Sequence, residues 1–448
     1  MDIFNLLPLE LCVFVARNYL ALYDCFMWMH ASRRLFYMFC WERHGLHGRW
    51  FAEKFRVINP RFSKKITTVD WDKLATLPSW EKRLIRWNEQ KIVSFEIRDE
   101  KTALRYTWAP YLDLSFVGKI NNTSAFGRVR SLSLSTCRGL GDASGLGSVD
   151  NLNISCSDVS DVSGLGGVRV LNLAVCRNVT DVSSLKGVYS LNISHCPGVT
   201  DVSALGKVHD LNLFNCPGVE DVSALGNVHS LVMSYNPRIK DVSNLGNVHS
   251  LTISNCTGVT DVSALGNVCI LDVSGCPGIS DVSMLGNVRR LNISACHGIT
   301  DVSALGRVSI LYMSSCKNIS DVSALGGVVF LDMSFCKNIT DVSALGGVYG
   351  LNISGCVNIT DVSSLGGVCI LEAFHCTGIT DVSALGRVQY LDISHCTGIT
   401  DVSALGRVHS LNIAFASGIT DISALESVNL LNIDRDLFLK RREIGNKT

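Results

Sequence analysis

A pattern of apolar and polar positions recurs every twenty residues along most of the chain. Between residues 161 and 420 the phrase Asp-Val-Ser-Ala-Leu-Gly-x-Val-x-x-Leu-x-Ile-Ser-x-Cys-x-Gly-Ile-Thr occurs in thirteen consecutive copies without insertion or deletion. Two copies precede these, 122–141 and 142–160, of which the second is one residue short, and half-copies flank the series. A period this short and strict predicts a solenoid in which each copy is one coil packed only on its neighbours.

Each copy has the apolar spacing of one coil with an inner and an outer side. In the copy 201–220 the alternation Leu211, Asn212, Leu213 is the period-two pattern of a short strand with one buried face, so we expect one strand per coil in a parallel sheet. Seven apolar positions per coil face inward. Their burial contributes on the order of 10 to 20 kcal/mol, and ordering the coil costs roughly the same or more. A single coil is therefore not expected to fold alone.

The recurring polar residues and glycines predict the turns. An aspartate opens each coil from Asp161 to Asp421, and it fits a cap on a single helical turn. Calcium binding by this column is the alternative, although the Gly-rich nonapeptide of calcium-binding β-rolls is absent. The position two after the cysteine is Gly or Asn in nearly every coil, which predicts a left-handed backbone there and strain at Arg238. The Gly of Ala-Leu-Gly gives way to Lys186 and Glu426, so that position prefers Gly without requiring a positive φ.

Cysteine is used once per coil. Of the 18 cysteines, thirteen are assigned to one repeat position: Cys137, Cys156, Cys176, Cys196, Cys216, Cys256, Cys276, Cys296, Cys316, Cys336, Cys356, Cys376 and Cys396. This constant position predicts a packing column of small side chains, in place of a disulfide framework or a zinc site. Asn236 and Ala416 occupy the same position, so we expect the column to supply volume and weak hydrogen bonds.

Composition divides the chain into a repetitive and a non-repetitive part. All seven tryptophans lie within the first 110 residues. We predict a helical domain at 1–42, a basic, Trp-rich helical connector and cap at 43–110, the solenoid at 111–434, and a basic C-terminal tail at 435–448.

Net charge and hydropathy narrow the range of partners. The chain has 40 basic and 40 acidic residues, so its bulk charge does not favour nucleic acid or membrane as a partner. Residues 41–91 contain 12 Lys or Arg against 6 Asp or Glu, which fits a solvated connector, with phosphate contact as the alternative. The start of the chain lacks the positive segment of a signal peptide, and the apolar run 11–29 is interrupted by charges. We therefore expect a soluble protein of the cytoplasm or nucleus.

The phrase Leu-x-Ile-Ser-x-Cys-x-Gly-Ile-Thr-Asp-Val-Ser-Ala-Leu resembles the cysteine-containing leucine-rich repeat, with a return path similar to that of bacterial internalins. The resemblance covers 111–434. It implies an α/β-type solenoid, curved into an arc, with a parallel sheet on its concave face that binds protein. At twenty residues a coil has room for a helical turn on the convex side but not for a full α-helix.

The N-terminal residues Leu7-Pro8-Leu9-Glu10-Leu11 resemble the opening of an F-box, a small all-α domain. Asp24 and Cys25 match the start of its second helix, which the segment Cys25 to Trp28 makes unusually bulky, and His30 to Phe36 resemble the segment that opens its third helix. An F-box followed by such repeats is typical of ubiquitin-ligase substrate receptors, and the array phrase also resembles those of F-box proteins of large DNA viruses. The resemblance implies that a Skp-type adaptor contacts Leu7, Pro8, Glu10, Leu11, Phe14 and Leu20.

The concave positions differ from coil to coil, and they contain the candidate binding residues. Aromatic side chains lie beside acidic ones in the second half of the array, at Phe330, Asp332, Phe335, Tyr349, Glu372, Phe374, His375, Tyr390, Asp392 and His395. Exposed aromatics next to carboxylates favour a basic or amphipathic protein partner, and neutral divergence of a solvated sheet is the alternative. His209, His229 and His249 also form one column, read as solvated neutral histidines with a shared zinc ion as the alternative.

These patterns favour binding over catalysis. No nucleophile with a base and acid, phosphate loop or cofactor motif is found in the sequence, so we expect neither enzymatic activity nor a cofactor. The leading hypothesis is a substrate receptor of a cullin-RING ubiquitin ligase, in which the F-box-like helices dock on the adaptor and the solenoid holds a protein. The alternative is a non-ligase binding scaffold or decoy whose N-terminal helices only cap the array.

Overall fold

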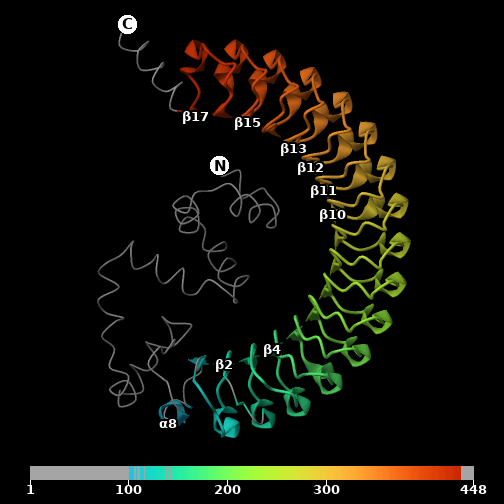
Figure 1. The fold of residues 1–448 in the computed structure, drawn as a ribbon, viewed down its shortest axis with the longest axis vertical. Coiled ribbons are helices and arrows are strands. Elements are labelled where there is room, and N and C mark those ends of the chain that lie inside the picture. Colours follow the sequence, from blue (N-terminus) through green and yellow to red (C-terminus); the bar gives the residue numbers. More distant parts are fainter. Residues whose placement is uncertain are drawn as a thin grey trace, which may run out of the picture. The chain divides into compact units, whose positions relative to one another are not determined.

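The computed structural model describes residues 100–104, 107, 111–115, 117–137, 139–140 and 143–434 (Figure 1). The chain divides into two units, 1–90 and 91–448. The F-box-like domain predicted at 1–42, most of the connector 43–110 and the tail 435–448 lie outside the described residues. Within that description, no helix is both long and apolar enough to cross a membrane.

The described residues form one parallel sheet of 17 strands, with a short helical turn between successive strands from β1 onward. The strands are β1 (Tyr111–Asp113), β2 (Ser131–Ser133), β3 (Asn151–Asn153), β4 (Val170–Asn172), β5 (Ser190–Asn192), β6 (Asp210–Asn212), β7 (Ser230–Val232), β8 (Ser250–Thr252), β9 (Ile270–Asp272), β10 (Arg290–Asn292), β11 (Ile310–Tyr312), β12 (Phe330–Asp332), β13 (Gly350–Asn352), β14 (Ile370–Glu372), β15 (Tyr390–Asp392), β16 (Ser410–Asn412) and β17 (Leu430–Asn432). The helical elements are the α-helix α8 (Glu100–Ala103) and the 3₁₀ turns η3 (Thr123–Phe126), η4 (Ser144–Leu146), η5 (Ser163–Leu165), η6 (Ser183–Gly187), η7 (Ser203–Leu205), η8 (Ser223–Leu225), η9 (Ser243–Leu245), η10 (Ser263–Leu265), η11 (Ser283–Asn287), η12 (Ser303–Arg307), η13 (Ser323–Gly327), η14 (Ser343–Gly347), η15 (Ser363–Gly367), η16 (Ser383–Arg387), η17 (Ser403–Arg407) and η18 (Ser423–Leu425).

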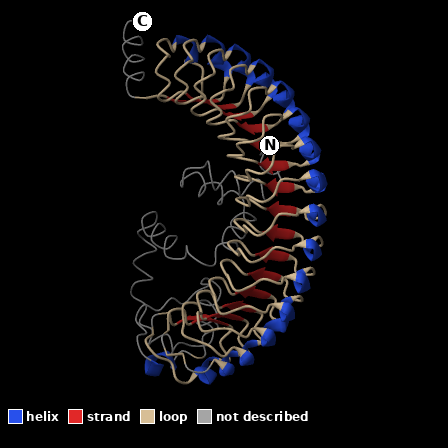
Figure 2. Ribbon diagram, turned by 45° about the vertical axis from the view of Figure 1, so that its right-hand side comes forward, coloured by secondary structure: helices blue, strands red, loops and turns tan. Residues whose placement is uncertain are grey.

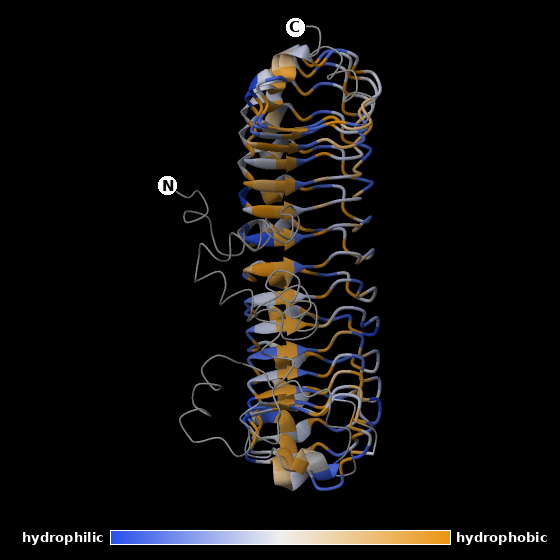
Figure 3. Ribbon diagram, turned by 90° about the vertical axis from the view of Figure 1, so that its left-hand side faces the viewer, coloured by the Kyte–Doolittle hydropathy of each residue, from blue (hydrophilic) through white to orange (hydrophobic). Residues whose placement is uncertain are grey.

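Each strand pairs with the strand of the next coil, so the order in the sheet follows the order in the chain. The central leucines form one column; for example, Leu211 pairs with Leu231. In the repeat array the strands line the inner side and the helical turns lie on the outer side (Figure 2). Figure 3 shows hydrophobic residues running through the column of strands. The predicted parallel sheet is confirmed.

The core contains the seven apolar positions expected for each coil. In the coil 201–220 these are Val202, Leu205, Val208, Leu211, Leu213, Cys216 and Val219, all of which are at most 2% exposed. The same positions are buried in nearly every coil, and together they form one continuous hydrophobic cluster. Because each coil covers the inner side chains of the next, removal of any coil would expose this core to water.

The aspartate column caps the helical turns, as predicted. In each coil from Asp161 to Asp421 the aspartate Oδ1 accepts a hydrogen bond from the backbone N–H two residues later, such as that of Ser283 to Asp281 at 2.9 Å. The backbone and side chain of Ser283 lower the pKa of Asp281 from its ordinary value of 3.8. The turn is a 3₁₀ turn of three to five residues in most coils, short enough for the twenty-residue repeat.

The prediction of a left-handed backbone two residues after the cysteine is wrong except at Gly139, where φ is 74°. Positive φ instead occurs at the residue before the cysteine position, for example His395 (58°) and Phe415 (61°). Gly is favoured two residues after the cysteine because the coils approach closely there: a Cβ on Gly258 would lie 2.5 Å from the carbonyl oxygen of Ile239.

Residues other than Gly at the position two after the cysteine bond to the preceding coil or extend into solvent. The Nδ2 group of Asn358 donates to the carbonyl oxygen of Lys337 at 2.7 Å. Arg238 does not have a positive φ, so the strain predicted for it is absent, and its Nη2 lies 2.9 Å from Glu220 Oε2. At the Gly of Ala-Leu-Gly the backbone is right-handed, as expected; Gly206 has φ −61°.

The cysteine column is a hydrogen-bonded packing column. The Cys296 thiol donates to the carbonyl oxygen of Val273 in the preceding coil at 3.2 Å, and the other coils repeat this bond. Burial raises the pKa of Cys296 to about 12. All the described cysteines are free thiols. The role predicted for the column, volume and weak hydrogen bonding, is confirmed.

Cys156 does not belong to this column, which corrects the sequence assignment. It is exposed, with φ 58°, and it lies at the position that precedes the column in other coils. Ser157 takes the place in the column, where it is 7% exposed with its Oγ 3.6 Å from Cys176 Sγ. The pairing of Leu152 with Leu171 fixes this register, so the residue missing from the coil lies after Ser157.

Candidate functional site

The concave surface presents three columns of variable side chains. The entry column contains the residue before each strand and the first strand residue, such as Tyr349 and Tyr390. The middle column contains the last strand residue, such as Asp332 and Asp392. The exit column contains the second and third residues after the strand, such as Phe374 and His375, which follow β14. The ten candidate residues all fall in these columns, spread over coils 321–400.

The middle column has a structural role that sequence reasoning missed. Asp332 Oδ1 accepts the backbone N–H of Ser334 at 3.0 Å, and Asp392 Oδ1 accepts that of Ser394 at 2.9 Å. Asn352 makes the same bond to Ser354 at 2.9 Å. The side-chain oxygen therefore closes the turn that follows the strand. Replacing Asn by Asp keeps this bond and adds a negative charge to the concave surface.

The exit column places aromatic side chains on a strained backbone. His375 and His395 have φ of 58°, where Gly355 of the neighbouring coil has 72°. A bulky residue is disfavoured in this conformation, and Gly or Asn fits it at lower cost. The aromatic residues are therefore not explained by the needs of the turn. Strained positions of this kind are candidates for function.

The exit aromatics of the second half form one cluster. The Phe374 ring packs edge-on against His395, with ring centroids 5.0 Å apart, and His395 stacks on Phe415 at 4.7 Å. Phe374 is 39% exposed and Phe415 is 60% exposed. Phe415 is not among the ten candidate residues. We call Phe374, His375, His395 and Phe415 the exit cluster.

The entry column of the same coils is apolar and exposed. Tyr349 is 41% exposed, Tyr390 is 47% exposed and Val329 is 45% exposed. The Phe330 ring lies 5.4 Å from Tyr349, centroid to centroid. A hydrogen bond with the Cys369 thiol is the main cause that raises the pKa of Tyr349 to about 12.

Two of the predicted residues also have a packing role. A Cβ on Gly350 would lie 2.6 Å from the Phe330 ring, and one on Gly355 would lie 2.5 Å from the Phe335 ring. Each ring therefore covers a glycine of the next coil, so substitution of Phe330 or Phe335 would alter stability as well as binding.

Charge on this part of the concave face has one sign. In coils 321–400 the three columns contain Asp332, Glu372 and Asp392 but no Lys or Arg. The basic residues of these coils, Lys337 and Arg387, lie outside the columns. The resulting surface joins exposed aromatic rings to a row of carboxylates, and that combination favours a partner with both apolar and cationic groups.

The first half of the array has aromatic groups that the sequence prediction did not assign to a site. In the entry column Tyr189, His209, His229 and His249 stack in a ladder with centroids 4.5, 4.6 and 4.7 Å apart. In the exit column Phe214 lies 5.1 Å from His195 and 5.2 Å from Tyr235. The pKa of His229 is lowered mainly by burial, and to a smaller extent by the flanking His209 and His249. Across the part of the chain described, no group of three His, Cys, Asp or Glu residues has a geometry that could hold a metal ion.

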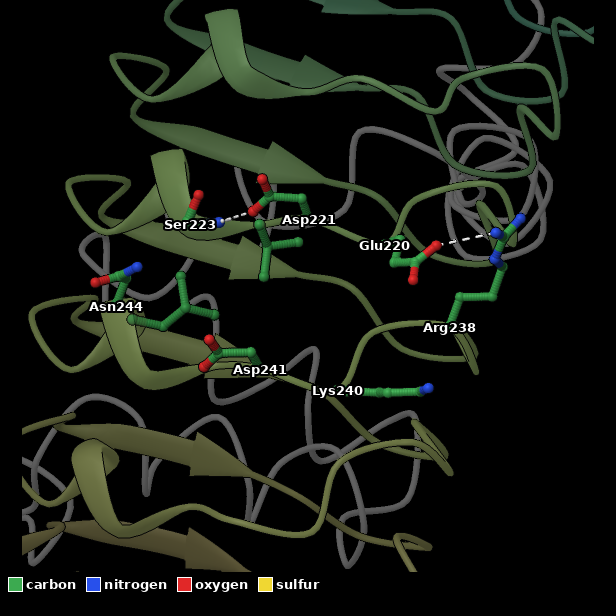
Figure 4. A pocket seen from close by; sticks show the side chains of 9 residues that line it. Glu220, Asp221, Ser223, Arg238, Lys240, Asp241 and Asn244 are labelled. Atoms are coloured by element: carbon green, nitrogen blue, oxygen red, sulfur yellow. Dashed lines mark hydrogen bonds and ion pairs between the residues drawn. The ribbon is translucent and has the colours of Figure 1, made fainter.

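A pocket of about 280 Å³ lies on the return path of coils 201–260, away from the three columns (Figure 4). Its lining includes Glu220, Arg238, Lys240 and Asp241. Arg238 pairs with Glu220, and Asp241 accepts the backbone N–H of Ser243 at 2.9 Å. Because these charges are of both signs and largely used within the array, the pocket is a weaker candidate than the concave face.

Comparison with known proteins bears on the fold. No protein-family model matches the chain, and no curated protein matches it. Among solved structures, a leucine-rich-repeat protein of Leptospira interrogans has a TM-score of 0.56 at 15% identity, with 79% of this chain and 99% of that chain covered. Internalin InlF of Listeria monocytogenes has a TM-score of 0.46 at 19% identity, covering 72% and 91%. The InlJ functional domain of the same species, described as including a cysteine ladder, has a TM-score of 0.44 at 18% identity, covering 67% and 68%. The array of regular twenty-residue coils therefore has the leucine-rich-repeat fold.

Proposed function

We propose that the chain is a protein receptor whose concave surface at coils 321–420 holds a partner protein. The exit cluster supports this proposal most strongly. Phe374, His375 and Phe415 are exposed, and the positive φ of His375, His395 and Phe415 is a conformation that favours Gly or Asn. Aromatic residues of this kind frequently supply most of the binding energy of an interface. The carboxylates of the middle column, beside the cluster, add selectivity by charge.

We further propose that the N-terminal residues dock on a Skp-type adaptor, so that the partner is presented to a cullin-RING ubiquitin ligase. This part rests on the sequence similarity of residues 7–36 to an F-box. Leu7, Pro8, Glu10, Leu11, Phe14 and Leu20 would make the adaptor contacts. A scaffold or decoy without ligase activity would use the same concave surface and would not bind the adaptor.

Affinity purification of the tagged full chain, followed by mass spectrometry, tests both parts. Replacing Leu7 and Pro8 by Ala should abolish recovery of the adaptor and leave recovery of the partner intact. Replacing Phe374 by Ser and Phe415 by Ser should reduce partner recovery at least tenfold and leave adaptor recovery intact.

Tyr235→Ser is a matched control for the second pair, since Tyr235 is an exposed exit-column aromatic in a distant coil. Circular dichroism checks that each variant is folded. Unchanged adaptor recovery after the Leu7 and Pro8 substitutions would remove the ligase assignment. Unchanged partner recovery after the Phe374 and Phe415 substitutions would remove the concave site.

A further inference from the structure

We infer that the partner segment held at coils 321–400 is an amphipathic α-helix with a basic stripe, lying along the array at right angles to the strands. This inference rests on the concave site proposed above and specifies what that site recognises. It follows from the order of three columns on the same coils: an apolar entry column, an acidic middle column and an aromatic exit column.

The spacing of the carboxylates matches one face of a helix. Adjacent strands of a sheet lie about 4.8 Å apart. Asp332 and Glu372 are two strands apart and Glu372 and Asp392 are one strand apart, which places them at about 0, 10 and 14 Å along the array. An α-helix rises 1.5 Å per residue, so residues i, i+7 and i+11 on one face lie at about 0, 10.5 and 16.5 Å. Lys or Arg at those three positions would each meet one carboxylate.

An extended peptide does not match this spacing. Its side chains on one face recur every 6.6 Å or so, at about 6.6 and 13.2 Å, and the carboxylate at about 10 Å falls between them. Addition of a partner strand to the sheet is also unavailable in these coils, because β12, β13, β14 and β15 each pair on both sides.

The width of the surface suits a helix as well. From the entry column to the exit column the chain advances four to six residues, of which the exit residues form a turn. A fully extended segment of that length spans roughly 13 to 20 Å, which sets an upper limit on the width. A helix with its side chains is about 10 to 12 Å wide. It would lie over the middle column with apolar side chains on one flank against Tyr349 and Tyr390 and on the other flank against Phe374.

The carboxylates of the middle column can bind a partner without losing the hydrogen bonds that they make within the array. Asp332 and Asp392 each use Oδ1 to accept a backbone N–H. Asp392 also accepts from Ser394 Oγ and, at Oδ2, from Asn412 Nδ2 at 2.9 Å. Each carboxylate oxygen has two lone pairs, so Oδ2 of both residues can accept a further hydrogen bond. A nucleic-acid strand is disfavoured, because its phosphates would face three carboxylates and no Lys or Arg in the columns of these coils.

Fluorescence anisotropy with a defined probe tests the inference on the full chain. The probe is an 18-residue helical peptide of Leu and Ala with Lys at positions 3, 10 and 14; its matched control has the same composition with the three Lys on three different faces. We expect the striped peptide to bind at least tenfold more tightly, with an affinity that falls as salt is raised.

The chain itself supplies isosteric variants. Asp332→Asn, Glu372→Gln and Asp392→Asn together remove the charge, and the two new Asn residues keep the turn bond that Asn352 already makes. This triple variant should lose roughly tenfold in affinity for the striped peptide and most of the salt dependence. Asp272→Asn is the matched control, an acidic middle-column residue outside coils 321–400, and it should bind as the natural chain does.

Equal binding of the two peptides, binding of neither, or an unchanged affinity in the triple variant would each overturn the helix inference. Preferential binding of a single-stranded RNA probe would overturn it too. The proposed concave site is judged separately by the Phe374 and Phe415 substitutions in partner recovery. If those substitutions abolish recovery while the striped peptide fails to bind, the site stands and the helical partner does not.

Discussion

Substitution of Asn236 tests how the cysteine column stabilises the array. This asparagine takes the place of the cysteine in its coil and is fully buried. Its Oδ1 accepts the N–H of Cys216 at 2.7 Å, and its Nδ2 donates to the carbonyl oxygens of Leu213 and Met233, both at 2.9 Å. Asn236→Ala removes three hydrogen bonds at once. At about 1 kcal/mol for each bond, with a further cost for buried groups left without partners, the loss should be roughly 3 to 5 kcal/mol.

Asn236→Cys should cost far less, although it also removes the carboxamide. A thiol at this position would donate to the Leu213 carbonyl oxygen, as the Cys256 thiol donates to that of Met233 at 3.1 Å. The Cys216 N–H would lose its bond to Oδ1. It would donate to the carbonyl oxygen of Leu213 instead, as the Cys256 N–H donates to that of Ile253 at 3.3 Å. We expect this variant to lie within about 1 kcal/mol of the natural chain.

Hydrogen exchange on the full chain is the suitable assay, because a long array need not unfold in one step. The protection of the Cys216 amide measures the opening of this coil directly. A loss of 3 kcal/mol corresponds to exchange that is faster by roughly 150-fold. If Asn236→Ala and Asn236→Cys exchange at the same rate, then volume alone maintains the column and its hydrogen bonds contribute little.

Three further predictions concern other columns. The lowered pKa of Asp281 means that its hydrogen bonds stabilise the fold above pH 3.8 and that this contribution is lost as the pH falls below 3.8. In an acid titration followed by circular dichroism, Asp281→Asn should therefore lose less stability than the natural chain. Identical titration curves for the two proteins would refute the capping role. Under native conditions iodoacetamide should label the exposed Cys156 before Cys296, because the Cys296 pKa of about 12 suppresses the reactive thiolate. Mass spectrometry measures the order of labelling, and a disulfide between neighbouring coils would contradict the register. Restoring the repeat phrase with Ala373→Ile and Phe374→Ser should hold or raise thermal stability by up to about 2 kcal/mol while weakening the partner by about 2 kcal/mol or more; a consensus-restored chain that binds fully would show that Phe374 is not an anchor.

The positions and the register of the strands could be predicted because the same pattern recurs in each coil. The Leu-x-Ile pair identifies the strand in each coil, and an exact period leaves one way to pair the strands. The position with positive φ could not be found in this way. Its residue changes from coil to coil, as at His375, Gly355 and Phe415, because bonds to the neighbouring coil impose the conformation: the His375 N–H donates to the Ser394 carbonyl oxygen at 2.9 Å.

Composition is a misleading guide to local structure where two physical causes select the same residue. Gly and Asn two residues after the cysteine suggested a left-handed turn, yet Gly is needed there for close approach and Asn for a bond to the preceding coil. Cys156 was assigned to the column because it is a cysteine. Its place is fixed by distance from the strand: Ile154 is buried, and Ser157 follows it by the same three residues that separate Leu173 from Cys176.

The middle column explains how this fold can vary its binding surface at little cost in stability. A side-chain oxygen two residues before the capped amide closes the turn after many of the strands, and both Asn352 and Asp392 supply it at 2.9 Å. Because the bond uses an oxygen that the two residue types share, exchanging one for the other changes the charge of the concave face by one unit and leaves the turn closed. Val232, the last residue of β7, shows that the column also accepts a residue without a side-chain oxygen. The fold therefore fixes where the concave side chains lie, while their charge and size remain available for recognition of a partner.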